Sequence, residues 1–220
     1  MIIITIDGPG GVGKGTLALF LVQKLNYNYL NSGSIYRSIA HIAETHGIPL
    51  DDTEKLITIG KSIKFTVNPN NLDADIIYKN EIINQYIFNE EIAKIASKIS
   101  SIKDLRESLV SIQRSFARKP GLIAEGRDMG SVIFPNADIK FFMNANNKTR
   151  AKRRFKQLKD KGFNVSLTQL IEELNARDRR DLTRKVSPLV IPEDSILITT
   201  DNKTIDEVRK EVIKHIKKVI

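Results

Sequence analysis

A glycine-rich turn near the N-terminus holds the first residues able to do chemistry. An apolar run from Ile2 to Ile6 ends at Asp7, and a helical pattern begins after Lys14, with apolar residues at i, i+3 and i+4. A strand, a glycine turn and a helix in this order form the context in which a P-loop binds phosphate. Backbone N–H groups and the helix N-terminus converge there on an anion. The sequence predicts a polyphosphate cradle formed by Gly8, Pro9, Gly10, Gly11, Val12, Gly13, Lys14, Gly15 and Thr16.

The hydroxyl of this motif stands one position later than in the strict P-loop pattern. Gly15 follows the lysine, and Thr16 supplies the hydroxyl. The shift leaves the phosphate cradle intact, and Gly-Lys-Gly-Thr resembles the nucleoside monophosphate kinases. The alternative is a glycine-rich turn with an incidental lysine, which the flanking strand and helix patterns disfavour.

A second polar group follows the buried-type strand Leu122 to Glu125. In Gly126-Arg127-Asp128-Met129-Gly130, an arginine and a carboxylate stand between two glycines, just past the carboxyl end of that strand. Open α/β sheets bind ligands at this edge. A surface turn with an ion pair is the alternative, and the position favours a binding site.

A basic stretch lies between the last two predicted strands. Residues 148–161 carry eight lysines and arginines, and a helix further on ends in Arg177-Asp178-Arg179-Arg180-Asp181-Leu182-Thr183-Arg184. Residues 177, 180/181 and 184 share one helix face. Interleaved aspartates would repel a nucleic-acid backbone, but they suit a pocket where carboxylates orient arginines that bind phosphates. The alternative is an exposed charged helix with local ion pairs.

Composition limits the class of protein. The 220 residues carry 35 Lys+Arg against 26 Asp+Glu, a net charge of +9 that implies an anionic partner. The absence of cysteine excludes disulfides and thiolate metal sites. No signal peptide or apolar stretch of membrane-spanning length is evident, so we expect a cytoplasmic protein.

The remaining patterns alternate strands with helices and predict an α/β fold. We expect a turn at Ser32-Gly33 before a helix opened by Tyr36 and Arg37. The expected inserted subdomain has strands at 63–67, 74–78 and 81–86, with a turn at 68–71. Residues 89–116 predict two helices separated at Lys103-Asp104. The later elements are a helix at 53–63, strands at 139–143 and 196–199, and helices capped at Ser166 to Gln169 and Thr204 to Glu207.

Five segments in order resemble bacterial cytidylate kinase over nearly the whole chain. They are GPGGVGKGT at 8–16, NSGSIYR at 31–37, GLIAEGRDMGSVIFP at 121–135, KGFNVS at 161–166 and RDRRDLTRKVSPL at 177–189. The resemblance implies one P-loop kinase domain of the α/β class with a five-stranded parallel sheet core. The core would comprise residues 1–31, 117–149 and 186–220. An acceptor-binding region with a small antiparallel insert would span 32–116, and a helical lid with the arginine helix 150–185.

The resemblance also implies roles for individual residues. The reaction would be phosphoryl transfer from ATP to CMP or dCMP, with Mg²⁺ near Thr16, directly or through water. Catalytic residues would be Lys14, Arg127, Arg153 and Arg177, and the lid arginines Arg150, Arg153 and Arg154. Contacts to CMP would come from Ser32, Tyr36, Arg37, Ser97, Arg106, Arg127, Asp128, Arg177, Asp181 and Arg184. A monophosphate is ionised at neutral pH, so we expect no general base. The partners would be small nucleotides, without nucleic acid or membrane, and the chain a monomer.

Two other functions stay open at this point. Another P-loop small-molecule kinase would act on UMP, dTMP or shikimate, and the residues alone do not separate CMP from UMP. A nucleic-acid-binding ATPase would use the basic stretch, but stacking aromatics are missing near residues 148–185. One departure from the family pattern is Glu125, where we expect aspartate or another small acid before Gly126.

Overall fold

The computed structural model describes residues 1–67, 74–160, 162 and 164–219. The turn predicted at 68–71 lies outside the described residues, as do Lys161 and Phe163 of the KGFNVS segment. Within the described part of the chain, no helix is both long and apolar enough to cross a membrane.

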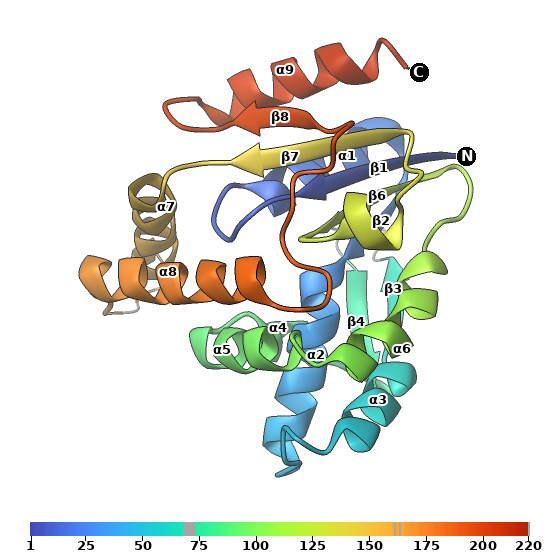
Figure 1. Cartoon of the computed structure of the whole chain (residues 1–220), viewed down its shortest axis with the longest axis vertical. Coiled ribbons are helices and arrows are strands. Elements are labelled where there is room, and N and C mark those ends of the chain that lie inside the picture. Colours follow the sequence, from blue (N-terminus) through green and yellow to red (C-terminus); the bar gives the residue numbers. More distant parts are fainter. Residues whose placement is uncertain (68–73, 161, 163, 220) are drawn as a thin grey trace.

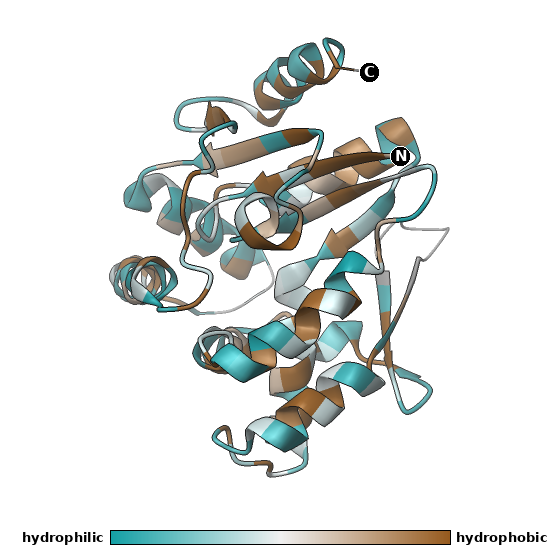
Figure 2. Ribbon diagram, turned by 45° about the vertical axis from the view of Figure 1, so that its right-hand side comes forward, coloured by the Kyte–Doolittle hydropathy of each residue, from teal (hydrophilic) through white to brown (hydrophobic). Residues whose placement is uncertain are grey.

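The centre of the molecule is a sheet of five parallel strands (Figure 1). Their order across the sheet is β2 (Asn28–Asn31), β6 (Gly121–Gly126), β1 (Ile2–Asp7), β7 (Ile139–Asn144) and β8 (Ile196–Thr199). The central strands are apolar on both faces, as buried parallel strands must be, and they stand out as hydrophobic ribbons in Figure 2. The predicted α/β fold with a five-stranded parallel core is confirmed.

Alternate residues of these strands belong to two hydrophobic cores, one on each face of the sheet. Ile123 joins the core formed with α1 (Lys14–Leu25) and α9 (Ile205–Ile216). Its neighbours Leu122 and Ala124 join the other core, which includes α2 (Ser32–Thr45) and the short helix η1 (Met129–Ile133). The predicted capping box of the last helix is present, because Thr204 and Glu207 bond each other's backbone N–H.

The second core also holds together the helices that follow β2 in the chain. Its helices are α3 (Thr53–Ser62), α4 (Asn84–Ile87), α5 (Glu90–Ile99) and α6 (Lys103–Arg114). A separate antiparallel sheet, β3 (Lys64–Val67), β4 (Ala74–Tyr78) and β5 (Glu81–Ile82), forms the predicted insert.

Three predicted boundaries are wrong. Ser32 and Gly33 do not form a turn; they begin α2, because the Asn31 side chain caps the helix by accepting from Ser34 N at 3.1 Å. The strand expected at 81–86 ends at Ile82, since α4 begins two residues later. The break in the helical stretch precedes Lys103, which is the first residue of α6.

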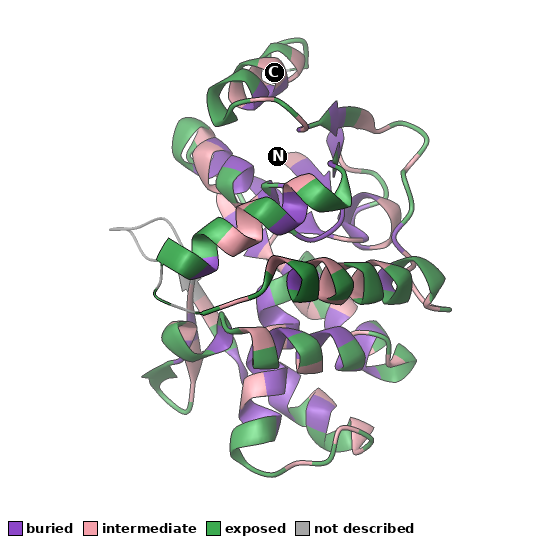
Figure 3. Cartoon of the chain, turned by 90° about the vertical axis from the view of Figure 1, so that its left-hand side faces the viewer, coloured by how far each residue is buried: buried purple, intermediate pink, exposed green. Residues whose placement is uncertain are grey.

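Helices α7 (Asn147–Asp160) and α8 (Leu167–Thr183) pack on each other at one end of the sheet (Figure 1). Both are exposed over much of their length, unlike the core strands (Figure 3). Few buried side chains hold them in place, which is the arrangement expected of a segment that moves.

All five strands are parallel, so the segments that follow them meet at one edge of the sheet. The glycine turn follows β1, α2 follows β2, the Arg127–Asp128 turn follows β6, and α7 follows β7. This edge therefore brings together four of the segments that the sequence marked for ligand binding.

Candidate active site

The glycine turn after β1 has a backbone that only glycine adopts easily. Gly8, Gly11 and Gly13 have φ values of 143°, 80° and 97°. A Cβ on Gly8 would lie 2.1 Å from the carbonyl oxygen of Met143. The buried Lys14 ammonium donates to the carbonyls of Gly8 and Pro9, both at 2.8 Å. The lysine and turn thus form one compact unit at the N-terminus of α1.

Positive charge is concentrated beside this turn. A Cβ on Gly10 would lie 3.5 Å from Nη2 of Arg127 and 3.7 Å from Nη1 of Arg177. Burial, followed by the charge of Arg127, lowers the pKa of Lys14 well below its ordinary value, although the Glu125 carboxylate opposes this. Burial and then Arg127 lower the pKa of Arg177 to about 9. The cations destabilise one another, and an anion bound among them would relieve that cost.

A donor-side cavity of about 500 Å³ opens on the exposed side of the turn. Gly11, Val12, Gly13 and Thr16 line it, together with residues of α7 and of the loop after β8. Its volume lies within the usual range for small-molecule sites. Arg153 forms part of its wall, donating to the Thr200 hydroxyl at 2.9 Å and the Thr200 carbonyl at 2.7 Å. The structure thus places Arg153 beside the donor cavity.

The residues around this turn fit a magnesium ion that arrives with a polyphosphate. No cluster of three or more His, Cys, Asp or Glu side chains able to hold a metal is found in the described ranges. Thr16 presents an exposed hydroxyl to the donor cavity, whereas Asp7 already accepts two backbone hydrogen bonds. Mg²⁺ commonly uses one or two protein oxygens together with substrate phosphates, and Thr16 suits that mode.

A second pocket, the acceptor-side pocket, lies beside Arg127 and Arg177, whose guanidinium groups are near Gly10. Every residue that the resemblance assigns to CMP lines this one pocket, although they come from α2, α5, α6, the turn after β6, and the C-terminal part of α8 with the residue that caps it. They are Ser32, Tyr36, Arg37, Ser97, Arg106, Arg127, Asp128, Arg177, Asp181 and Arg184. The cavity volume is only about 50 Å³, below the usual range for ligand sites.

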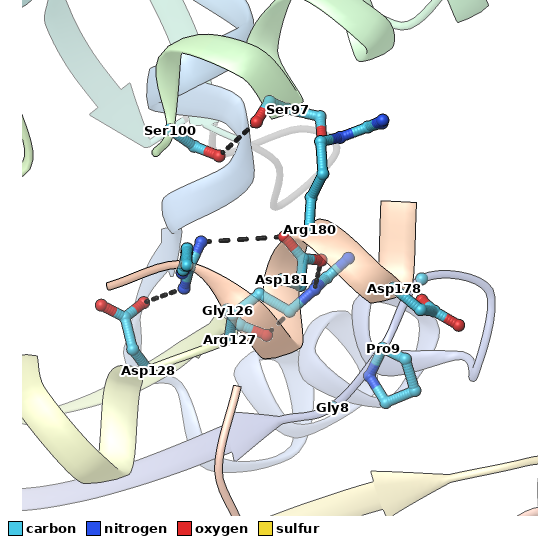
Figure 4. A network of polar contacts seen from close by, with 12 residues as sticks. Gly8, Pro9, Ser97, Ser100, Gly126, Arg127, Asp128, Asp178, Arg180 and Asp181 are labelled. Atoms are coloured by element: carbon cyan, nitrogen blue, oxygen red, sulfur yellow. Dashed lines mark hydrogen bonds and ion pairs between the residues drawn. The ribbon is translucent and has the colours of Figure 1, made fainter. Parts of the chain in front are cut away.

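Ion pairs link side chains that line the acceptor-side pocket, and Figure 4 shows the pair of Arg127 and Asp181. Arg106 pairs with Asp128, and Arg127 Nε donates to Asp181 at 2.9 Å. Burial opposes ionisation of Asp181, but Arg127 and its neighbouring arginines lower the pKa of that carboxyl. Aspartates therefore orient the arginines, as the alternating pattern predicted.

Several buried polar atoms around this pocket lack a hydrogen-bond partner among the residues that the structure describes. They include Tyr36 Oη, Arg106 Nε, Arg177 Nε and Arg184 Nη2. Buried donors of this kind are rare in proteins, and their concentration in one pocket indicates a polar ligand.

A third cavity, of about 170 Å³, joins the two sides. It shares Gly11 and Arg154 with the donor-side cavity, and Arg37 and Arg177 with the acceptor-side pocket. Arg37 donates to the carbonyls of Ile87 and Asn89, and burial, followed by Arg154, lowers its pKa to about 10. We call this hollow the transfer cavity, since it shares lining residues with both of the other cavities.

Two of the three expected lid arginines are paired with carboxylates of the protein. Arg150 is buried and donates to the carbonyls of Gly10 and Ala145, while Asp178 pairs with its guanidinium. It therefore supports the glycine turn through the Gly10 carbonyl and already has a protein carboxylate as its partner. Arg154 pairs with Glu90 of α5 at the rim of the transfer cavity.

The role of Asp7 was not predicted from the sequence. Its carboxylate, only 1% exposed, accepts from the backbone N–H groups of Met129 at 2.9 Å and Gly130 at 2.7 Å. Burial raises its pKa to about 6. Asp7 thereby fixes the turn that carries Arg127 and Asp128 against the glycine turn. The only signal in the sequence was a charged residue at the end of an apolar strand.

Glu125, the departure noted in the sequence, is buried at the end of β6. The Tyr29 hydroxyl donates to its carboxylate, which would lie 3.3 Å from a Cβ on Gly15. Glu125 therefore sits beneath the start of α1 and contributes negative charge near Lys14.

Comparison with known proteins agrees with this geometry. The cytidylate kinase family model matches residues 4–218. A cytidylate kinase of Aeromonas salmonicida is 41% identical over 97% of this chain and 93% of that protein. A cytidylate kinase of Coxiella burnetii is 42% identical over 98% of this chain and 92% of that protein.

Solved structures with low identity share the fold. A gluconokinase from Sinorhizobium meliloti superposes with a TM-score of 0.51 at 10% identity, covering 99% of this chain and 92% of that one. An uncharacterized protein from Eubacterium ventriosum gives a TM-score of 0.52 at 16% identity, covering 99% and 98%. From the family model, the relatives and the arrangement of the site together, the chain belongs to the cytidylate kinase family of phosphotransferases.

Proposed function

We propose that the chain transfers the γ-phosphoryl group of ATP to CMP or dCMP, giving ADP and CDP or dCDP, through the residues described above. The observation that supports this most strongly is the transfer cavity, where Gly10, Arg37 and Arg177 lie between a donor-side cavity and an acceptor-side pocket. Two phosphate tails entering from opposite sides would meet there.

The glycine turn and Lys14 bind the ATP phosphates in this proposal. Arg127 and Arg177, beside Gly10, neutralise the charge that develops on the transferred group. Magnesium bound with ATP would offset charge on the phosphate oxygens, and Thr16 is placed to hold it. We assign Arg153 to the donor nucleotide, because its guanidinium lies in the donor-side wall. Positioning and electrostatics carry the reaction, and no side chain needs to remove a proton from the ionised acceptor phosphate.

The acceptor-side pocket would hold CMP with its phosphate toward the transfer cavity. Arg37, Arg127 and Arg177 bind that phosphate. Arg127 and Arg177 lie near Gly10, and Arg37 and Arg177 line the transfer cavity. Ser97, Arg106 and Asp128 read the base, Asp181 and Arg184 contact the sugar side, and Ser32 and Tyr36 complete the wall. Because the cavity is about 50 Å³, CMP must displace the Arg106–Asp128 and Arg127–Asp181 contacts, or widen the pocket, to enter.

The proposal includes the division of the chain into core, acceptor region and lid. Helices α7 and α8 would close over both nucleotides and exclude water, which suppresses hydrolysis of ATP. The same proposal holds that the chain acts as a monomer in the cytoplasm.

A coupled assay of ADP release tests the function. ATP is supplied with each ribo- and deoxyribonucleoside monophosphate in turn, and with shikimate, beside a Lys14→Ala control. We expect the highest kcat/KM for CMP and dCMP, and loss of that activity in the control. Higher activity on UMP, dTMP or shikimate would overturn the proposed acceptor.

A further inference from the structure

Arg180 makes a polar contact within the site, and the proposed function assigns no role to this residue. It lies on α8 and lines the transfer cavity, and its Nε donates to the hydroxyl oxygen of Ser97 at 3.1 Å (Figure 4). Ser97 lies on α5, is 6% exposed and lines the acceptor-side pocket. The contact therefore joins a lid helix to a buried hydroxyl in the pocket.

The direction of this hydrogen bond decides what the Ser97 hydroxyl can do. A serine hydroxyl has one donor and two acceptor positions. Arg180 uses an acceptor position, and no other side chain or carbonyl of the described residues receives the hydroxyl proton. The Ser97 O–H is therefore available to donate to a ligand in the acceptor-side pocket. Without Arg180, the hydroxyl could rotate freely and would have no fixed orientation toward that ligand.

We propose that Arg180 is a positioning residue that fixes the orientation of the Ser97 hydroxyl toward a polar atom of the bound pyrimidine. This inference rests on the proposed function, because it assigns the acceptor base to the pocket of Ser97. It makes recognition of the base depend on a residue of the lid helix that does not itself touch the base.

Two neighbouring contacts indicate that this hydroxyl is oriented only when α8 lies against α5. Glu90, Lys94 and Ser97 occupy one face of α5 at i, i+4 and i+7. Glu90 pairs with Arg154 of α7, and Lys94 pairs with Glu173 of α8 at 2.8 Å. The same face of α5 thus carries all three contacts to the lid helices, with Ser97 at the end nearest the acceptor-side pocket. Base recognition and lid closure are then coupled in one set of contacts.

A double-mutant cycle on the full chain tests this role. KM and kcat for CMP and for ATP are measured in Arg180→Met, in Ser97→Ala and in the double variant. Arg179→Met is the matched control, because Arg179 is an equally exposed arginine of α8 outside the three cavities. Circular dichroism and thermal unfolding establish that each variant is folded.

We expect Arg180→Met to raise the KM for CMP about tenfold, the effect of losing one oriented hydrogen bond to the ligand. The KM for ATP should be unchanged, Arg179→Met should resemble the parent chain, and Arg180→Met should have no added effect in the Ser97→Ala background.

Three results would overturn the inference: an unchanged KM for CMP, additive effects of the two substitutions, or an equal loss for CMP and ATP. The last would show a general role in holding the lid. A parent chain that phosphorylates another acceptor in preference to CMP would instead contradict the proposed function, so the two failures are distinguishable.

Discussion

The donor and acceptor sides of this site are built in different ways. The donor side is a backbone turn of consecutive residues beside an open cavity of about 500 Å³. The acceptor side is a set of charged side chains from distant parts of the chain, drawn together by ion pairs around about 50 Å³. In the proposed function, a polyphosphate is bound by a shape already present, whereas the acceptor has to compete with contacts within the protein.

The two sides can bind phosphate in different ways because one uses backbone N–H groups and the other uses arginine side chains. Backbone N–H groups cannot rotate away, so a glycine turn keeps its anion site without a ligand. Buried arginines need a counter-charge at all times, and Asp128 and Asp181 supply it in this conformation. The ion pairs thus stabilise the buried arginines of the narrow pocket. In the proposed function, oxygen atoms of the ligand can replace the carboxylates of Asp128 and Asp181.

The largest expected effect is a loss of kcat on substitution of Arg177, which lines both the transfer cavity and the acceptor-side pocket. Arg177→Met should lower kcat by about three orders of magnitude, as for other arginines that neutralise a transferred phosphoryl group. Steady-state assays with CMP and ATP would measure it, with Arg179→Met as the control. A change in KM alone would place Arg177 in ground-state binding and remove it from the transfer step.

Asp128→Asn should show how strongly the acceptor side depends on its ion pairs. The substitution leaves Arg106, 4% exposed, without its partner, and Arg184 with less counter-charge. Breaking a buried pair costs about 3–5 kcal/mol of unfolding free energy, which urea titration would measure.

The matched donor-side change is Thr16→Val, which removes an exposed hydroxyl. It should alter the unfolding free energy by about 0.5 kcal/mol or less. Equal losses in the two variants would contradict the contrast between a backbone-built and a side-chain-built side.

Asp7 supplies a pH dependence, because it connects the two sides through buried hydrogen bonds. Its pKa is raised to about 6 from an ordinary value of 3.8, so between these values the folded chain holds a proton that the unfolded chain has released. Stability from this group is therefore lost as pH rises through that window, by on the order of 3 kcal/mol.

Urea unfolding at pH 4.5 and 6.5 would compare the parent chain with Asp7→Asn. Other carboxyls contribute to both chains, so the difference between the two slopes isolates Asp7. The substituted chain should lose less stability on raising the pH. Parallel pH profiles would show that the Asp7 carboxyl titrates as in the unfolded state.

A small, salt-dependent effect is expected for the contact between α5 and α7. The Arg154 and Glu90 side chains are 27% and 34% exposed, so Glu90→Gln should change unfolding free energy by about 1 kcal/mol or less. The difference should shrink as salt is raised toward about 1 M, where the Debye length is about 3 Å. A salt-independent loss would mean that Glu90 acts as a buried group.

The sequence-based predictions also differ between the donor side and the acceptor side. The glycine turn was predicted from contiguous residues, because its strand, turn and helix are neighbours in the chain. The five-stranded core and the acceptor residues required the resemblance to a family, since spacing alone does not tell which helices meet. The turn expected at Ser32-Gly33 was wrong because the cap of Asn31 starts the helix earlier.

Charged residues show where sequence patterns fail. Arg150 and Arg154 belong to the same basic stretch, but one supports Gly10 from the interior and the other pairs with α5. Nothing in their spacing reveals this, because burial and partners come from packing. Asp7 and Arg180 were missed for the same reason, since their partners lie 83 or more residues away along the chain.

The sequence by itself determined the anion-binding turn, the alternation of strands and helices, and the excess of positive charge, because these depend on local conformation and composition. Only the tertiary structure decided which arginines face a ligand and which are neutralised by the protein. The physical reason is that a buried charge takes its role from the partners that folding places beside it.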